Sequence, residues 1–137
     1  MLSDNQPVNR GNFVRRILAL SACLTAWSAV AAFASDYRLV MVDQPGCAYC
    51  MAWEDQIGPA YDKTAEGAYA PLVRADLHIG PPDGIEYARR VNFTPTFILV
   101  RDGQEIGRME GYVGEDFFWP VFAKFLQDNT DFVPSTN

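Results

Sequence analysis

The sequence is short of basic residues. Lysine and arginine number 11 against 17 aspartates and glutamates, so the formal net charge is -6 at pH 7. Such a chain has no basic stripe to neutralise phosphates, which argues against nucleic-acid binding. It also lacks low-complexity tracts, a collagen-like glycine period and the internal repeats that solenoids need. What it does have is an apolar fraction of 49% in 137 residues, as expected for one globular domain.

The N-terminal segment has the three parts of a secretory signal. A polar and basic stretch precedes an apolar one over residues 17–33, and Ala32-Phe33-Ala34 forms a small-residue cleavage site. We therefore expect residues 1–34 to be a signal peptide and the protein to be periplasmic. The remaining domain, residues 35–137, has 8 basic and 16 acidic side chains and a net charge of -8.

Other interpretations of this segment also imply export. The stretch ending at Cys23 is similar to a lipobox, but the apolar run before it is shorter than the ~7 to 15 residues of a signal. A lipid anchor at Cys23 is therefore the less favoured alternative. Arg15-Arg16 weakly resembles a twin-arginine signal. An uncleaved segment over 17–34 would fall just short of the ~20 residues that a spanning helix needs.

The expected mature domain keeps two cysteines, Cys47 and Cys50, in a C-x-x-C arrangement. With one histidine, His78, it has fewer than the four Cys or His ligands that structural zinc usually takes. A purely structural disulfide would add little stability, because the loop-entropy gain is smallest for short loops. In an oxidising compartment, this spacing therefore predicts a redox-active pair.

The residues around the pair predict where it lies. A strand-like run, Tyr37–Asp43, is followed by a Gln44-Pro45-Gly46 turn and by roughly helical periodicity from Cys47 onward. At a helix start, unpaired N–H groups and the helix dipole favour a thiolate and lower a thiol pKa from ~8.5 toward ~3.5 to 7.5. Cys47 is therefore the expected nucleophile, and Cys50, one turn deeper, is the expected resolving thiol.

The rest of the chain predicts a mixed sheet. Further strands are expected at Pro71–Leu77, Thr96–Val100 and Glu105–Tyr112, with an Asp-Gly turn between the last two. A short helix is expected over Ile85–Arg90. The order βαβ-α-ββα then predicts a single α/β domain: a four-stranded mixed sheet with helices on both faces and Glu105–Tyr112 at an edge.

A final helix is expected to begin near Glu115-Asp116, whose acidic side chains suit a helix start. Pro120 would lie in or near its first turn, where the missing N–H costs little. The apolar face of this helix is expected to hold Phe117, Val121 and Phe125, together with Phe118 and Phe122.

Over most of residues 36–128 the chain resembles the thioredoxin superfamily. The matching motifs are Cys47-Ala48-Tyr49-Cys50, Thr94-Pro95-Thr96 before a strand, the Asp-Gly hairpin, and Gly111-Tyr112-Val113-Gly114 before the last helix. The resemblance implies a minimal thioredoxin fold of glutaredoxin size. It also implies a cis peptide bond at Pro95 beside the cysteines and substrate-binding backbone at Thr94. Tyr49, between the cysteines, is a further candidate for shaping the substrate surface.

The chain departs from thioredoxins proper beside the cysteines. Gly46 replaces their tryptophan, Ala48-Tyr49 replaces Gly-Pro, and Met41 occupies the position of their buried aspartate. The proton-relay role of that aspartate in thioredoxins therefore has no matching carboxylate at position 41 of this chain. Glu54, four residues after Cys50, is a candidate for that role, although a solvated helical glutamate is the simpler interpretation.

Longer stretches look like one subgroup of the superfamily. Pro-Gly-Cys-x-Tyr-Cys and Gly-Tyr-x-Gly-Glu-Asp-Phe-Phe-Trp are similar to the small periplasmic SoxS-type thioredoxins of bacterial sulfur-oxidation clusters. The resemblance implies a protein that keeps a cysteine-bearing sulfur carrier reduced.

These features predict a thiol-disulfide oxidoreductase without a cofactor, acting mainly as a reductant. Its expected partner is a substrate protein with a disulfide or modified cysteine. The expected electron donor is a membrane thiol transporter, since the periplasm has no soluble thiol buffer. We expect a monomer. The residues do not fix the direction of thiol-disulfide exchange, so an oxidase stays an alternative. A general disulfide isomerase is less favoured, because residues 35–137 leave no room for the dimerisation domain that a resemblance to isomerases would require.

The alternative from a different class is a copper-binding or copper-delivery protein on the same fold. It would use Cys47, Cys50 and a third ligand from His78, Met41 or Met51, because thiolate and thioether ligands suit Cu(I). Copper proteins of this fold tend to have a longer cysteine spacing and a well-placed histidine, which makes this the second choice.

Overall fold

The computed structural model describes residues 35–134. The expected signal peptide, residues 1–34, and with it Cys23, lies outside the described residues and stays a prediction. The first half of the domain contains β1 (Tyr37–Asp43), α2 (Ala48–Gln56), α3 (Gly58–Tyr61), α4 (Ala65–Tyr69) and β2 (Leu72–Asp76). The second half contains β3 (Thr96–Arg101), β4 (Gln104–Glu110) and α5 (Glu115–Asn129).

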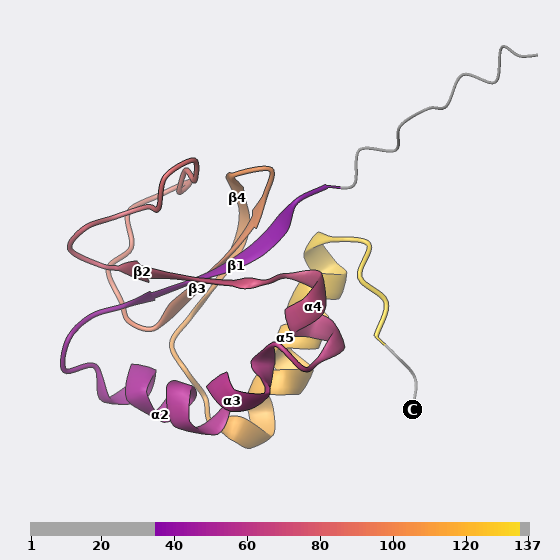
Figure 1. Cartoon of the computed structure of the whole chain (residues 1–137), viewed down its shortest axis with the longest axis horizontal. Helices are drawn as coiled ribbons and strands as arrows, with labels where there is room; N and C mark the ends of the chain where they lie inside the picture. The colour runs from indigo at the N-terminus through magenta and orange to yellow at the C-terminus, as the bar shows by residue number, and fades with distance from the viewer. Residues whose placement is uncertain (1–34, 135–137) are drawn as a thin grey trace, which may run out of the picture. The chain divides into compact units, whose positions relative to one another are not determined.

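The strands form one mixed sheet in the order β2-β1-β3-β4 (Figure 1). β1 is parallel to β2 and antiparallel to β3, which in turn is antiparallel to the edge strand β4. Asp102 and Gly103 turn the β3–β4 hairpin with φ of 52° and 82°, the left-handed backbone that a two-residue Asp-Gly loop requires. The predicted four-stranded mixed sheet, with β4 at its edge, is confirmed.

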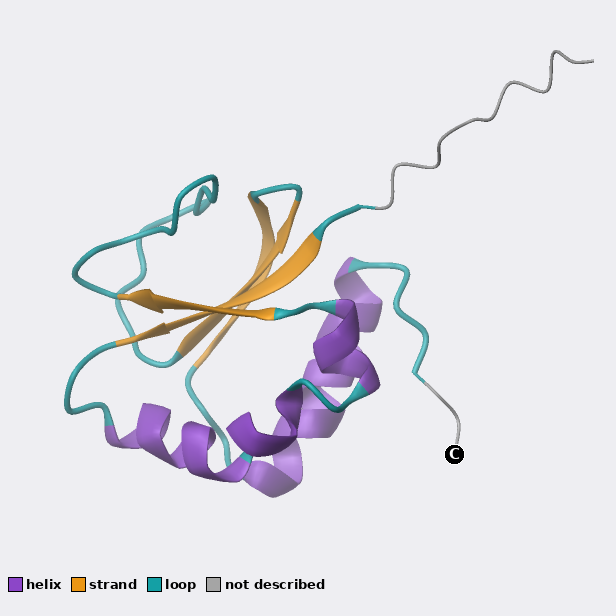
Figure 2. Cartoon of the chain, viewed as in Figure 1, coloured by secondary structure: helices purple, strands orange, loops and turns teal. Residues whose placement is uncertain are grey.

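The helices cover one face of this sheet (Figure 2). Alternate residues of β1 and β3 point to that face, where they meet large side chains from α2, α3 and α5. The centre of this cluster is formed by Leu39, Met41, Phe97, Leu99, Trp53, Tyr61, Phe118 and Phe122. Trp53 is fully buried there and contacts the ring of Phe97 at a centroid distance of 5.4 Å. The α2 helix that carries the cysteines is therefore fixed to the sheet through Trp53.

The opposite face is covered by a long loop between β2 and β3. Its buried residues are Val40, Val42, Ala75, Ile98 and Val100 of the strands with Ile85 and Val91 of the loop. The expectation of helices on both faces is therefore wrong for this face, where the loop supplies the apolar cover.

The helix expected over Ile85–Arg90 is not formed. Instead, the Glu86 N–H donates to the Gly103 carbonyl (2.8 Å), and the Glu105 N–H donates to the Glu86 carbonyl (3.1 Å). A helix of this length has few internal hydrogen bonds to offset its costly nucleation. Hydrogen bonds to the β3–β4 hairpin therefore replace those of the helix.

The apolar face expected for α5 is confirmed for Phe118 and Phe122, and Phe125 is half-buried against the same cluster, but the expectation is wrong for Phe117 and Val121. Phe118, Phe122 and Leu126 are its buried residues, whereas Phe117 is 64% exposed and Val121 also faces solvent. Positions 118, 122 and 126 are four residues apart and so lie on one side of the helix. Pro120 lies inside the helix rather than in its first turn.

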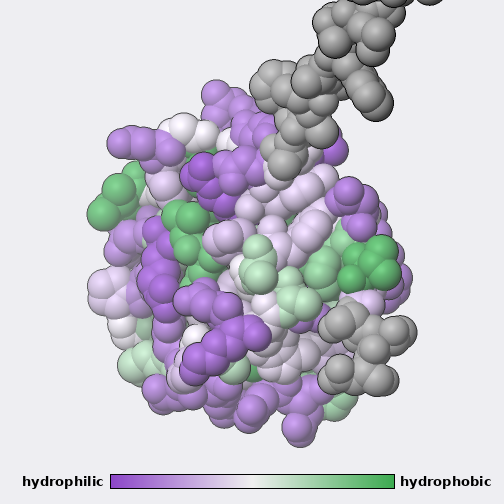
Figure 3. Space-filling model, turned by 45° about the vertical axis from the view of Figure 1, so that its right-hand side comes forward, coloured by the Kyte–Doolittle hydropathy of each residue, from purple (hydrophilic) through white to green (hydrophobic). Residues whose placement is uncertain are grey.

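On the face shown in Figure 3, the surface is largely hydrophilic, with small separate hydrophobic areas. Within residues 35–134, no helix is long and apolar enough to cross a membrane.

Candidate functional site

A disulfide joins Cys47 and Cys50 at the start of α2. The turn before it closes with the Cys47 N–H donating to the Gln44 carbonyl (3.2 Å), and Gly46 supplies the left-handed φ of 80°. Cys47 is the N-cap residue, and its Sγ accepts a hydrogen bond from the Cys50 N–H (3.1 Å). The predicted helix start at Cys47 is therefore confirmed.

The two sulfurs differ in how far solvent reaches them. Cys47 is half-buried, whereas Cys50 is only 5% exposed. Cys50 belongs to the helix-side core, which is the apolar cluster between the sheet and the helices that contains Trp53 and Phe97. A reactant from solvent can approach Cys47 first. Tyr49, between them, is 66% exposed on α2.

The segment carrying Thr94 and Pro95 is hydrogen-bonded to the turn before Cys47. The Gln44 Nε2 donates to the Thr94 Oγ1 (2.9 Å), and the Thr94–Pro95 peptide bond is cis. The Pro95 carbonyl accepts from the Gly111 N–H (2.7 Å). The structure thus brings three separate motifs of the sequence to one end of the domain, and Gln44 is a contact residue that the sequence motifs did not reveal.

A pocket of about 510 Å³ beside the disulfide is lined by both cysteines and by four carboxylates. These acids are Asp43, Glu54, Asp55 and Asp76. Asp43 and Asp76 are register partners at the carboxyl ends of the parallel strands β1 and β2. Position at those strand ends was the sequence signal that could have found them, because parallel strands bring their ends together.

Burial and neighbouring carboxylates disfavour ionisation of Asp43. Burial, Asp76 and Glu54 raise the pKa of the Asp43 carboxyl above its ordinary value, while Arg74 partly opposes them. Glu54 is engaged elsewhere, since its two carboxylate oxygens accept from Arg74 Nε (2.9 Å) and Nη2 (2.5 Å). The structure thus places the predicted Glu54 beside the pocket, but in an ion pair.

Comparison with known proteins establishes the family. A family model described as a thioredoxin-like domain matches residues 29–126 of the chain. The chain belongs to the thioredoxin-like family. Its fold, its cysteine spacing and the cis bond at Pro95 agree with this membership, and the predicted resemblance is confirmed.

Two relatives of this thioredoxin-like chain narrow the comparison. The crystal structure of reduced SoxS, a periplasmic thioredoxin from Paracoccus pantotrophus, is 49% identical with a TM-score of 0.64; the match covers 66% of this chain and 96% of SoxS. A disulfide bond formation protein from Brevibacillus choshinensis is 30% identical over 107 residues, which is 77% of this chain and 86% of the relative. The thioredoxin-like protein is therefore a thiol-disulfide oxidoreductase, of a family that acts on disulfide-containing proteins.

The copper ligands considered from the sequence are spread over different places. His78 is exposed and lines a separate pocket of about 570 Å³, Met41 is fully buried in the core, and Met51 lines the disulfide pocket. Within the described part of the thioredoxin-like chain, no group of three or more His, Cys, Asp or Glu side chains is placed to hold a metal ion. His78 is thus not among the residues lining the cysteine pocket.

Proposed function

We propose that this thioredoxin-like protein is an exported reductant that cycles between a Cys47/Cys50 dithiol and the observed disulfide to reduce a partner protein. The observation that carries the proposal is the placing of this pair at the N-cap of α2, with Cys47 accessible and Cys50 buried. That difference in access supports attack by Cys47 and resolution by Cys50.

The cycle starts from the reduced protein. The Cys47 thiolate attacks one sulfur of the substrate disulfide, the substrate S–S bond breaks, and one substrate sulfur leaves as a thiolate that takes up a proton. Cys50, after losing its proton, attacks the Cys47 Sγ in the mixed disulfide and releases the second substrate thiolate. The substrate gains two electrons, and the Cys47–Cys50 disulfide is formed.

Three further residues are proposed to hold the substrate. The Thr94 backbone, beside buried Pro95, would hydrogen-bond to the extended chain around the substrate disulfide, since Thr94 is tied to the turn before Cys47. Tyr49 would contact the substrate surface from α2, where its ring is exposed.

The carboxylates of the disulfide pocket support the reducing direction. Asp43, Asp76 and their acidic neighbours repel a nearby thiolate and so destabilise the reduced pair relative to the disulfide. A dithiol whose reduced form is less stable gives up its electrons more readily, whereas a strong oxidant has a stabilised reduced form.

Location and partners are proposed from the signal-like N-terminus and from the similarity to SoxS, which is described as a periplasmic thioredoxin. The substrate would be a protein with a disulfide or modified cysteine, such as a sulfur-oxidation carrier protein. A membrane thiol transporter would supply electrons to a monomeric protein.

The reduction potential of the Cys47/Cys50 pair tests the proposal. We expect a potential of about -270 mV or lower when purified protein is equilibrated in graded thiol/disulfide buffers and trapped by alkylation. A potential near about -120 mV would reverse the direction to oxidation. A pair that does not cycle, in a protein that retains stoichiometric copper, would replace the oxidoreductase with the copper-binding alternative.

A further inference from the structure

The edge strand β4 carries a buried ion pair between Arg108 and Glu105. Both residues lie far from the two cysteines in the sequence. The Arg108 and Glu105 side chains are each only 6% exposed. Their contact is bidentate, with Arg108 Nε donating to Glu105 Oε1 (2.6 Å) and Nη2 donating to Oε2 (2.7 Å). Burying two charges is costly unless their remaining hydrogen-bonding groups are also satisfied.

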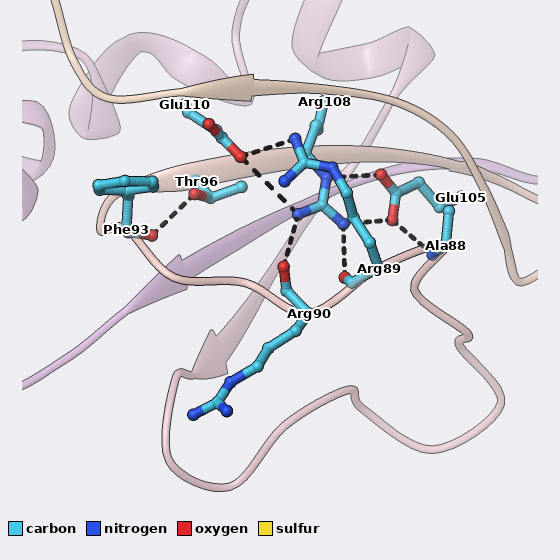
Figure 4. A network of polar contacts seen from close by, with 8 residues as sticks. All are labelled: Ala88, Arg89, Arg90, Phe93, Thr96, Glu105, Arg108 and Glu110. Carbon is cyan, nitrogen blue, oxygen red and sulfur yellow. Dashed lines mark hydrogen bonds and ion pairs between the residues drawn. The ribbon is translucent and has the colours of Figure 1, made fainter.

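The remaining hydrogen bonds of this pair go to one short segment, Ala88–Arg90 (Figure 4). Arg108 Nη2 donates to the Arg89 carbonyl (2.8 Å), and Nη1 donates to the Arg90 carbonyl (3.3 Å). The Ala88 N–H donates to Glu105 Oε2 (2.7 Å). This segment is in neither a helix nor a strand. Its N–H and carbonyl groups therefore find their hydrogen-bond partners in the Arg108 and Glu105 side chains instead of in the backbone of a helix or sheet.

The same segment leads directly to Thr94 and Pro95. Between them, Val91 is buried under the sheet, and the Phe93 carbonyl accepts from the Thr96 Oγ1 (2.7 Å; Figure 4). Thr94 is in turn bonded to Gln44 in the turn before the cysteines. The loop is thus tied to β4 at one end and to the disulfide turn at the other.

We propose that Arg108 is a positioning residue for substrate binding, which holds Ala88–Arg90 and thereby sets the place of the Thr94 backbone. The inference rests on the proposed role of Thr94 in holding the substrate. A planar guanidinium can bond two carbonyls and a carboxylate at fixed angles, which a lysine ammonium cannot reproduce. Arg108 does not line the disulfide pocket, so it acts on binding and leaves the exchange chemistry of the sulfurs unchanged.

The test compares a protein disulfide with a small one. Pre-reduced wild-type protein and Arg108→Lys react with insulin, whose chain must pair with the Thr94 backbone, and with 2-hydroxyethyl disulfide, which has no peptide backbone. We expect the variant to lose about 3- to 10-fold in rate constant for insulin, since misplaced binding groups weaken transition-state stabilisation. The rate constant for the small disulfide and the Cys47/Cys50 potential should stay unchanged.

Two further variants separate positioning from stability. Leu126→Ala destabilises the helix-side core without touching the loop, so it should leave the insulin rate unchanged at 25 °C. The double variant Arg108→Met with Glu105→Leu removes the pair without leaving a buried charge unpaired. It should keep the fold, and it should show the same loss toward insulin and faster hydrogen exchange of the Ala88 amide.

Three outcomes would overturn the inference. They are an unchanged insulin rate in Arg108→Lys, equal losses toward both disulfides, or an equal loss in Leu126→Ala. Failure of wild-type protein to react with the small disulfide would overturn the proposed function itself, and with it this inference.

Discussion

Asp43 places a negative charge next to the redox pair at the point where β1 ends. It faces its register partner Asp76, and both line the pocket that holds Cys47 and Cys50. Like charges directly opposite each other on adjacent strands are destabilising. A single carboxylate is thus placed to affect both the fold and the disulfide, and its removal should have two measurable consequences.

Asp43→Asn is expected to stabilise the fold at pH 7 and to make the potential of the pair less negative. Burial, Asp76 and Glu54 raise the pKa of Asp43 above its ordinary 3.8, so the native state binds a proton more tightly than the unfolded one. Its contribution to stability is therefore fully present below pH 3.8 and is lost as pH rises through the raised pKa. The potential should rise by on the order of 10 to 30 mV.

Urea unfolding and thiol/disulfide equilibration measure the two effects of Asp43→Asn. Asp128→Asn is the matched control, since Asp128 is exposed and paired with Lys124 on α5. A potential that stays constant or becomes more negative in Asp43→Asn would show that this carboxylate does not set the reducing direction.

Cys50→Ser is expected to stop the cycle after its first step. Cys47 can still attack a substrate disulfide, but no second thiol is present to release the substrate. A covalent complex with the substrate should therefore accumulate, visible by mass spectrometry and cleaved by dithiothreitol. Cys47→Ser should form no such complex, because buried Cys50 is 5% exposed; a complex through Cys50 would reverse the assigned roles.

Among the secondary-structure elements, α5 has two apolar faces, and tertiary packing determines which of them is buried. The helix offers apolar side chains at 117, 118, 121, 122, 125 and 126, so two overlapping stripes are available from periodicity alone. Packing selects the stripe that meets α2 and α3: Phe118 contacts Trp53 at 5.8 Å between ring centroids, and Phe122 contacts Tyr61 at 5.9 Å.

Two neighbouring phenylalanines of α5 should therefore differ sharply in their effect on stability. Phe118→Ala is expected to lower the free energy of unfolding by about 3 to 5 kcal/mol, because it leaves a cavity among buried rings. Phe117→Ala should change it by less than about 0.5 kcal/mol, since this side chain is mostly exposed. Urea denaturation measures both, and equal losses would contradict the observed face of the helix.

In the molecule as a whole, the stability of the fold depends on pH through carboxyl groups whose effects oppose each other. Burial alone would raise the pKa of Glu105, but hydrogen bonds from Arg108 and from the Ala88 N–H outweigh it and lower the pKa below 4.5. A depressed pKa gives stability that is present above 4.5 and is lost as pH falls through the lowered pKa. Asp43 contributes in the opposite sense.

Glu105→Gln is therefore expected to flatten the acid limb of the stability curve below pH 4.5. At pH 7 it should cost about 3 to 5 kcal/mol, because the buried Arg108 charge loses its bidentate carboxylate and keeps only the longer ion pair with Glu110, at 3.9 Å. Urea unfolding between pH 3 and pH 7 checks both effects. Glu115→Gln, at the exposed start of α5, is the control, and an unchanged acid limb in Glu105→Gln would assign it to other carboxylates.

Local patterns in the amino-acid sequence were enough to predict the features that depend on neighbouring residues. The strand Tyr37–Asp43, the helix start at Cys47 and the Asp-Gly hairpin follow from a short apolar run, turn residues and spacing over a few positions. The C-x-x-C pair and the Thr94-Pro95 motif were visible for the same reason, and they indicated the family correctly.

Features that depend on residues far apart in the chain became visible only in the folded domain. Ile85–Arg90 does not form a helix, because the N–H and carbonyl of Glu86 are hydrogen-bonded to the β3–β4 hairpin. The carboxylates Asp43 and Asp76 meet because β1 and β2 are parallel neighbours, and Arg108 finds the carbonyls of a loop 18 and 19 residues away. No local pattern encodes such contacts, since each gains its free energy only when packing brings both partners out of water together.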